Sequence, residues 1–132
     1  MSNGDFEKRK MTLIESITVR KQIQSQNKRE SGGNVFAMRA KKAKEVVAWE
    51  WEIVAALGKK PKAATKKRKV VITSLRSRLL DIGNLYGGGK ALVDAIVRIG
   101  LAVDDNPKFM ELEMHQYTRP KSCGITQIEV WE

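Results

Sequence analysis

The stretch RLLDIGNLYGGGKALVDAIVRIGLAVDD, residues 78–105, decides how this chain folds. Lys90 to Ile99 is rich in helix-compatible residues, and Gly100 stands where a left-handed cap ends such a helix. The glycines at positions 87–89 do not propagate a helix and readily adopt unusual backbone angles. The sequence therefore predicts a loop at these glycines, followed by a helix that Gly100 closes.

The predicted helix has one polar stripe. Lys90, Asp94 and Arg98 follow one another at four-residue steps and so share a face. Apolar residues cover most of the remaining surface: Leu92, Val93, Ala95, Ile96, Val97 and Ile99. We expect this helix to be largely buried.

Four carboxylates, Asp81, Asp94, Asp104 and Asp105, lie within this helix and its flanking turns. The chain elsewhere is basic, with 25 Lys and Arg against 15 Asp and Glu and a net charge of +10. Clustered carboxylates in a cationic chain indicate a divalent metal beside nucleic acid. The residues alone leave a second interpretation open, because 104–107 (DDNP) is also good turn chemistry and Asp81 suits a loop cap.

A net charge of +10 exceeds what solubility requires and indicates a polyanionic partner. Nucleic acid is the first candidate, although anionic membrane surfaces attract the same charge. No apolar run approaches the roughly 20 residues that span a bilayer, and residues 1–10 lack the apolar core of a signal peptide. We expect a cytoplasmic protein with no membrane partner, a disordered N-terminus at 1–11 and a single domain at 12–132.

The N-terminal half predicts a strand, a loop and a helix. Residues 12–23 alternate partly and contain β-branched side chains, as strands do. The polar stretch around Gly32 and Gly33 predicts a loop, in which Lys28 and Arg29 are either phosphate contacts or plain solvated charges. Asn34 is a suitable N-cap for a helix from Phe36 to Leu57, which Gly58 ends.

Apolar residues of this helix recur at three- and four-residue spacing, and we expect them to pack on a sheet: Phe36, Ala40, Ala43, Val47, Trp51, Val54 and Leu57. Trp49 and Trp51 have two interpretations. They belong to the core or a dimer interface, or they are platforms on which bases stack.

Residues 58–69 predict a basic loop without acidic residues, with these cations as DNA-binding candidates: Lys59, Lys60, Lys62, Lys66, Lys67, Arg68 and Lys69. Pro61 and the small residues disfavour compact folding there. Electrostatic capture of a phosphate backbone, without sequence selectivity, is the functional interpretation. Two others remain: KKRK resembles a nuclear localisation signal, and such charges also merely solubilise a surface.

A strand at 69–78 follows and delivers Arg76 and Arg78, two further DNA-binding candidates, just ahead of Asp81. Alternation predicts strands at 109–117 and 125–132, which we expect to form an antiparallel hairpin. Cys123 and His115 suit neither a zinc site nor a catalytic pair, so we expect ordinary surface or turn residues. The chain is therefore expected to be α+β, a small mixed sheet of about four strands covered by two main helices.

Three segments, DIGNL (81–85), KALVDAI (90–96) and GLAVDD (100–105), resemble the signature of RusA-type Holliday junction resolvases, small phage and prophage endonucleases. The resemblance runs from about Val70 to Glu132 and is only architectural before that. It implies a RusA-like single domain in a bacterial host cell. It also implies a homodimer that cleaves four-way DNA junctions in recombination and repair, with Mg²⁺, or Mn²⁺, as cofactor.

The resemblance also implies residue roles. Catalysis falls to Asp81, Lys90 and Asp105, metal binding to Asp81, Asp104 and Asp105, and structural support to Asn84 and Asp94, the latter paired with Lys90 or Arg98. The chain departs from the family at position 83, where Gly83 replaces a second metal-binding aspartate, and in its longer spacer YGGG. Glu111 and Glu113 are the candidates to replace that ligand.

Three functions follow as hypotheses. The first is a Mg²⁺-dependent, structure-selective DNA endonuclease. The second is a dimeric DNA-binding protein of the same fold with impaired cleavage. The third is a basic RNA-binding or ribosome-associated protein.

Overall fold

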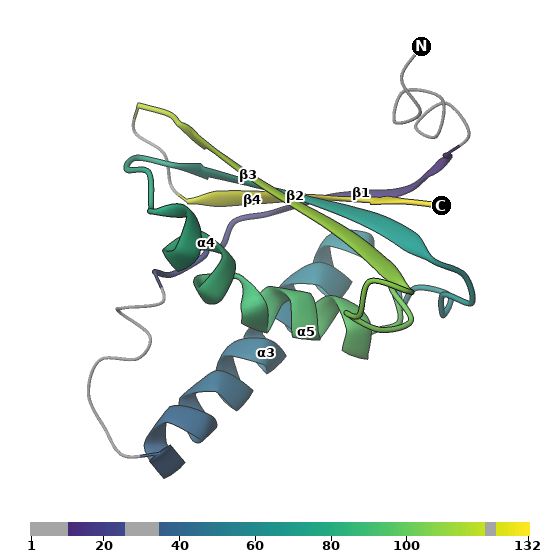
Figure 1. Cartoon of the computed structure of the whole chain (residues 1–132), viewed down its shortest axis with the longest axis horizontal. Coiled ribbons are helices and arrows are strands. Elements are labelled where there is room, and N and C mark those ends of the chain that lie inside the picture. The colour runs from purple at the N-terminus through teal and green to yellow at the C-terminus, as the bar shows by residue number, and fades with distance from the viewer. Residues whose placement is uncertain (1–10, 26–34, 121–123) are drawn as a thin grey trace.

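The computed structural model describes residues 11–25, 35–120 and 124–132. Four strands form one mixed sheet, and the three helices of the described residues lie on one of its faces (Figure 1). The elements in chain order are β1 (Leu13–Val19), α3 (Val35–Leu57), β2 (Arg68–Arg76), α4 (Ile82–Gly88), α5 (Lys90–Arg98), β3 (Met110–Thr118) and β4 (Ile125–Trp131). The expected α+β class is confirmed. None of the helices in the described ranges has both the length and the apolar character needed to cross a membrane.

The strand order is β1-β4-β2-β3, and β2 lies between the last two strands of the chain. β2 runs parallel to β3, from the pair Arg68–Met110 to the pair Arg76–Thr118, and antiparallel to β4. The expected hairpin between the last two strands is therefore wrong. The near-continuous apolar run of β2 suits an interior position in the sheet, but it does not by itself select the neighbouring strands.

A helical crossover connects β2 to its parallel neighbour β3, as parallel pairing requires. α4 and α5 form this connection, and Leu85, Leu92 and Ile96 bury their side chains against the sheet. On the sheet side of the core, β2 contributes the fully buried Val70 and Ile72. The crossover and the sheet together form the core.

The loop expected at the three glycines is wrong, because Gly87 and Gly88 belong to α4 and Gly89 continues into α5 with right-handed helical angles (φ −82°, ψ −3°). Close packing explains the glycine at position 89. A Cβ at position 89 would overlap the side chain of Met114 on β3 and approach the carbonyl oxygen of Leu85 to 3.2 Å. Glycine lets the joint between the two helices lie directly on the sheet.

The bounds of α3 agree with the sequence, but its buried face does not. Val46, Trp49 and Ile53 are buried, whereas Phe36 is 81% exposed and Trp51 is 74% exposed. Apolar residues occupy more than one face of this helix, so the periodicity alone fits two orientations. The orientation found lets the large Trp49 ring be buried completely, while the N-terminal end of α3 points away from the sheet (Figure 1).

Glycines end both long helices as expected. Gly58 has φ +74° and its N–H donates to the Val54 oxygen at 2.9 Å. Gly100 has φ +91°, and the N–H of Leu101 reaches back to the Ile96 oxygen at 3.1 Å. The end of α5 at Gly100 thus has the geometry of a Schellman-type cap, in which a left-handed residue reverses the chain.

Gly100 and Gly83 make a matched pair for a stability test. Gly100→Ala places a Cβ in the left-handed region and 3.3 Å from the Ala63 Cα atom, so we expect the free energy of unfolding to fall by about 1–2 kcal/mol. Gly83→Ala meets nothing within 4 Å in α4, and should raise it by roughly 0.5 kcal/mol. Urea unfolding measures both, and equal effects would contradict this account of Gly100.

Candidate nucleic-acid interface

Asp104 and Asp105 lie in the turn that follows α5. Asp104 Oδ1 accepts a hydrogen bond from the Asp105 N–H at 2.8 Å, and Asn106 Oδ1 accepts one from the Lys108 N–H at 2.7 Å. The N–H groups of Phe109 and Met110 donate to the Asn106 carbonyl oxygen. These residues therefore perform the turn chemistry anticipated from the sequence. Asp104 Oδ2 and the exposed Asp105 carboxylate take no part in these turn hydrogen bonds.

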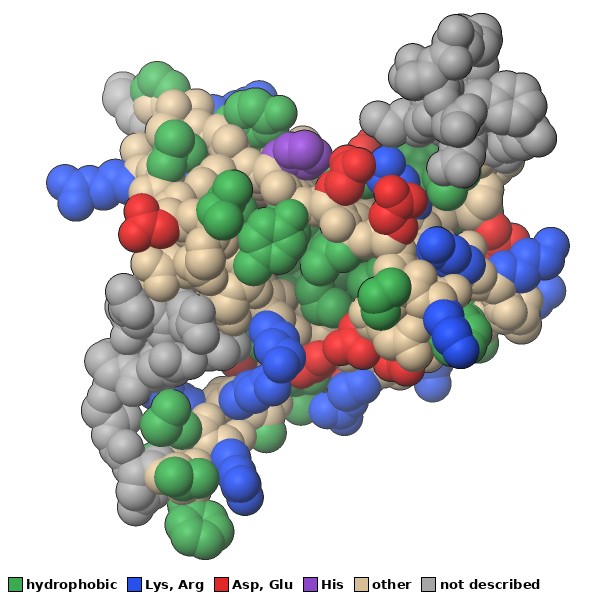
Figure 2. All heavy atoms as spheres, in the orientation of Figure 1, with side chains coloured by type: hydrophobic (Ala, Val, Ile, Leu, Met, Phe, Trp, Pro, Cys, Tyr) green, Lys and Arg blue, Asp and Glu red, His purple; other side chains and the backbone are tan. Residues whose placement is uncertain are grey.

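An open hollow brings Asp94 together with these two aspartates. We name it the acidic hollow, and its lining is Val46, Asp94, Val97, Arg98, Asp104 and Asp105. α3 contributes to its charge balance, because Lys42 Nζ lies 3.5 Å from Asp94 Oδ2 and Arg98 Nε lies 2.8 Å from Glu50 Oε1. Figure 2 shows acidic and basic side chains gathered over this part of the surface. The expected pairing of Asp94 with Lys90 or Arg98 is wrong, because α3 supplies the nearer partners.

Asp81 lies at the opposite end of the crossover. It precedes α4 as the N-cap residue, but its exposed side chain makes no capping hydrogen bond. The neighbouring Leu80 is tied to β3, where its N–H donates to Gln116 Oε1 at 2.9 Å and its oxygen accepts from Gln116 Nε2 at 2.6 Å. Asn84 is half-buried one turn into α4, and Lys90 is exposed at the start of α5.

The strand register separates Asp81 from the other two expected metal ligands. The Asp104–Asp105 turn leads into Met110, whereas Leu80 is held at Gln116, six positions along β3. At about 3.3 Å per residue this corresponds to roughly 20 Å. One chain therefore does not bring Asp81 together with Asp104 and Asp105.

The donor set fits a metal ion only in part. Within the ranges 11–25, 35–120 and 124–132, no three His, Cys, Asp or Glu side chains are placed to hold one metal ion. Mg²⁺ binds through one or two carboxylates and keeps several waters, and Asp104 with Asp105 can offer such a pair. Asp81 cannot complete it from the same chain.

The basic segment, defined here as residues 58–67, lies beside the aspartate turn. The N–H of Ala64 donates to the Gly100 oxygen at 2.7 Å, and the Arg68 N–H donates to the Phe109 oxygen at 3.0 Å. The first bond attaches the basic segment to the start of the 100–109 turn, and the second attaches Arg68, the first residue of β2, to the end of that turn. Its lysines all face solvent: Lys59, Lys60, Lys62, Lys66 and Lys67. Exposed cations and the Asp104–Asp105 pair thus occupy the same end of the molecule.

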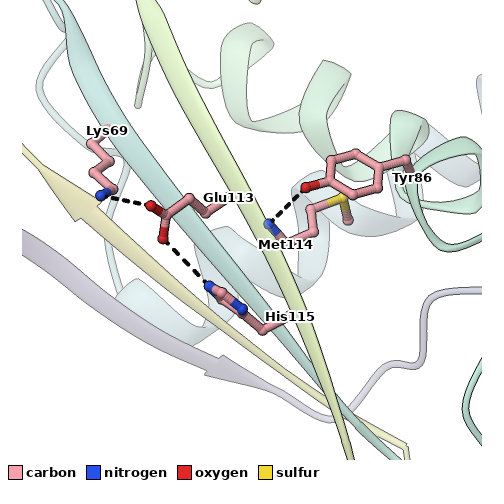
Figure 3. Close-up of polar contacts among 5 residues, drawn as sticks. All are labelled: Lys69, Tyr86, Glu113, Met114 and His115. Atoms are coloured by element: carbon pink, nitrogen blue, oxygen red, sulfur yellow. Dashed lines mark hydrogen bonds and ion pairs between the residues drawn. The ribbon is translucent and has the colours of Figure 1, made fainter. Parts of the chain in front are cut away.

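Arg68 and Lys69 are corrections to the expected DNA-binding set. Both belong to β2 and are buried, at 8% and 6% exposure. Arg68 Nε lies 2.9 Å from Glu132 Oε2, and its Nη1 donates to the Leu101 oxygen at 3.0 Å. Lys69 Nζ lies 2.9 Å from Glu113 Oε1 (Figure 3). Buried charges need internal partners, so these two cations hold the fold together.

Arg76 is a third correction. Its side chain is buried and donates to three oxygens, those of Arg78 (2.7 Å), Ile23 (2.8 Å) and the Ser74 hydroxyl (3.3 Å). Loss of hydration lowers the pKa of Arg76 from its ordinary value. Arg76 therefore fastens the segment after β1 to the end of β2, whereas Arg78 is exposed and stays a DNA-binding candidate.

The acidic residues of β3 do not replace the ligand missing at position 83. Glu113 bridges Lys69 and His115, with 3.3 Å between its Oε2 and His115 Nε2, on the sheet face away from the helices (Figure 3). Glu111 is exposed near the start of β3, whereas Gly83 follows the far end of β2. His115 is an exposed surface residue, as expected. Cys123, Asn34, Lys28 and Arg29 lie outside the described residues.

Sequence reasoning missed a second hollow next to the acidic one. Its lining is Glu50, Trp51, Val54, Lys60, Arg98 and Ile99, and we name it the α3–α5 hollow. Arg98 lines both hollows. No local pattern predicts it, because it exists only where α3, α5 and the basic segment meet. The sequence pointed toward it only through the base-stacking interpretation of Trp51.

The search against family models finds no match to this chain, and no curated protein matches it. The RusA resemblance therefore stays a prediction from three short segments.

Arg76 and Arg78 provide a test that separates a buried, structural arginine from an exposed one. Arg76→Ala leaves the Ile23 and Arg78 oxygens without their buried donor, so we expect a loss of about 2–4 kcal/mol in unfolding free energy. Arg78→Ala, on the surface, should change it by less than about 0.5 kcal/mol. Thermal or urea unfolding measures both, and a stable Arg76→Ala protein would refute the structural role.

Proposed function

We propose that the protein is a Mg²⁺-dependent endonuclease that binds branched DNA, four-way junctions above all, as a homodimer. The observation that carries this proposal is the attachment of the basic segment to the turn that holds Asp104 and Asp105. DNA recombination or repair in the cytoplasm of a bacterial host is the corresponding setting, for which the three RusA-like segments are the support.

The charge arrangement favours a phosphodiester substrate. Five exposed lysines of the basic segment attract a phosphate backbone without reading its sequence. Carboxylates beside that path repel the same phosphates, a cost that a divalent cation between them removes. When bound, Mg²⁺ activates water and stabilises charge on the phosphate and the leaving oxygen. Asp104 and Asp105 would hold it, and the lysines would position the backbone.

A second protomer gives Asp81 a role. Large apolar side chains flank it on the surface: Leu79 is 57% exposed, Ile82 73% and Tyr86 42%. Such a patch is typical of an interface. Packing of this patch in a symmetric dimer would place the Asp81 end of one chain against its copy, where carboxylates from two chains can share a site. Lys90, exposed on α5, is then available to a phosphate.

The rival function is junction binding without efficient cleavage. Gly83 lacks a carboxylate, and the described residues of one chain hold no three-ligand group. Both observations favour the rival, and neither weakens the DNA-binding surface. RNA is the competitor substrate that binding measurements must include.

Cleavage of a labelled synthetic four-way junction separates the two functions. With Mg²⁺ or Mn²⁺ we expect paired symmetric nicks, which Asp105→Asn reduces by more than roughly 10- to 100-fold, the loss typical when a group that only supports a ligand is removed. Gly83→Asp should increase cutting, because it adds a carboxylate beside Asp81 at the end where the proposed dimer brings the Asp81 residues of two protomers together. If the wild type binds without cutting and Gly83→Asp cuts, the rival is correct. If neither the wild type nor Gly83→Asp binds four-way junctions, both proposed functions are wrong.

Salt dependence tests the basic segment. Lys66→Ala/Lys67→Ala removes two exposed cations next to the aspartate turn, whereas Arg20→Ala/Arg119→Ala removes two exposed cations at the opposite end of the sheet. We expect the first pair to flatten the slope of log K against log salt by about 2, since each phosphate contact contributes about 0.9. The second pair should leave the slope unchanged. Equal slopes for the two variants would show that the basic segment does not contact the DNA.

A further inference from the structure

Trp51 is a large aromatic side chain that the fold does not use. It is 74% exposed in the middle of α3, whose buried face consists of Val46, Trp49 and Ile53. Packing within the chain therefore gives no reason for a tryptophan at this position. Exposed aromatic side chains of this size are more typical of binding surfaces than of plain solvated faces.

The α3–α5 hollow gives Trp51 a specific setting. Val54 and Ile99 supply apolar surface, while Lys60 and Arg98 bring positive charge from the basic segment and from α5. The hollow has a volume of about 570 Å³, in the range of clefts that hold small ligands. An aromatic ring, an apolar floor and two cations are the combination that receives a base with its phosphate.

Arg98 is already oriented for an anion. Its Nε lies 2.8 Å from Glu50 Oε1, and Glu50 is mostly covered, with 22% of its side chain exposed. A guanidinium carries five N–H donors, and the ion pair with Glu50 is made at Nε, so the donors of the two terminal nitrogens remain available to a phosphate. Glu50 balances only one of the two cations in the lining, which leaves the hollow with a net positive charge.

The hollow also lies where the proposed substrate passes. Lys60 belongs to the basic segment, and Arg98 lines both this hollow and the acidic hollow with Asp104 and Asp105. A nucleotide bound at Trp51 would therefore lie close to Asp104 and Asp105, on the same DNA strand whose phosphates these aspartates would approach. Duplex DNA keeps its bases stacked internally, so only an unpaired nucleotide, as at the centre of a branched structure, can present a base to Trp51.

We propose that the α3–α5 hollow binds an unpaired nucleotide, with its base stacked on Trp51 and its phosphate held by Lys60 and Arg98. This inference rests on the proposed DNA-binding function and adds a contact that selects branched or single-stranded DNA over duplex. Sequence selectivity is not expected, because every base has an aromatic face.

Phe36 provides a matched control, since it is an equally exposed aromatic residue of α3 at 81% exposure but does not line the hollow. The probes are a short single-stranded oligothymidylate and a blunt duplex of equal length. Trp51→Ala should weaken binding of the oligothymidylate by about 5- to 150-fold, the range of one lost stacking contact. Binding of the duplex should change less. Trp51→Phe should keep most of the affinity, and Phe36→Ala should match the wild type.

Tryptophan fluorescence gives a second readout. The oligothymidylate should quench the emission of the wild type and of Trp131→Phe, and the quenching should disappear in Trp51→Phe. A thermal unfolding curve like that of the wild type shows that Trp51→Ala is folded, as expected for an exposed residue.

Three outcomes overturn the proposal. If Trp51→Ala and Phe36→Ala bind the oligothymidylate equally well while Lys66→Ala/Lys67→Ala does not, the hollow is no base site and the DNA-binding function stands. If Trp51→Ala turns a dimer into a monomer in sedimentation, Trp51 is a contact between two copies of the chain. If the wild type binds no nucleic acid, this inference and the proposed function fail together.

Discussion

Parallel pairing of β2 with β3 is the constraint on which the rest of this structure depends. Two parallel strands cannot be joined by a tight turn, so the chain must cross the sheet between them. α4 and α5 form that crossing, and Gly89 lets their joint lie against Met114. The crossing carries the chain from Asp81, at the end of β2, back to the Asp104–Asp105 turn, at the start of β3. The same connection that completes the core therefore separates the carboxylates.

Burial separates the cations of β2 from those of the basic segment that precedes it. Arg68, Lys69 and Arg76 are close neighbours in sequence to the exposed lysines, but each is buried and has an internal partner. Desolvation makes an unpaired charge costly, so a buried cation is committed to the fold. The exposed lysines of the basic segment have no such commitment. They give the aspartate end of the molecule a concentration of exposed positive charge.

The contact between α3 and α5 creates the surface with the most varied chemistry. Two ion pairs cross it, Lys42 with Asp94 and Arg98 with Glu50. Arg98 lines both hollows: the acidic hollow, with its aspartates, and the α3–α5 hollow, which contains Trp51 and Lys60. The Asp104–Asp105 pair, the basic segment and Trp51, the groups on which the proposed functions rest, thus lie around this contact without forming part of the core.

The sequence by itself determined the class of the fold, the bounds of the long helix, the end of α5 at Gly100 and the basic segment, because these depend on local propensity and charge. Tertiary structure alone decided the strand order, since the apolar run of β2 fits several partners until the whole sheet forms. It also decided which face of α3 is buried, because only packing selects Trp49 over Trp51. A loop was wrongly expected at the glycines 87–89, since the close approach of Gly89 to Met114 on β3 has no local signature. The separation of Asp81 from Asp105 is likewise a property of strand register, which residues close in sequence cannot reveal.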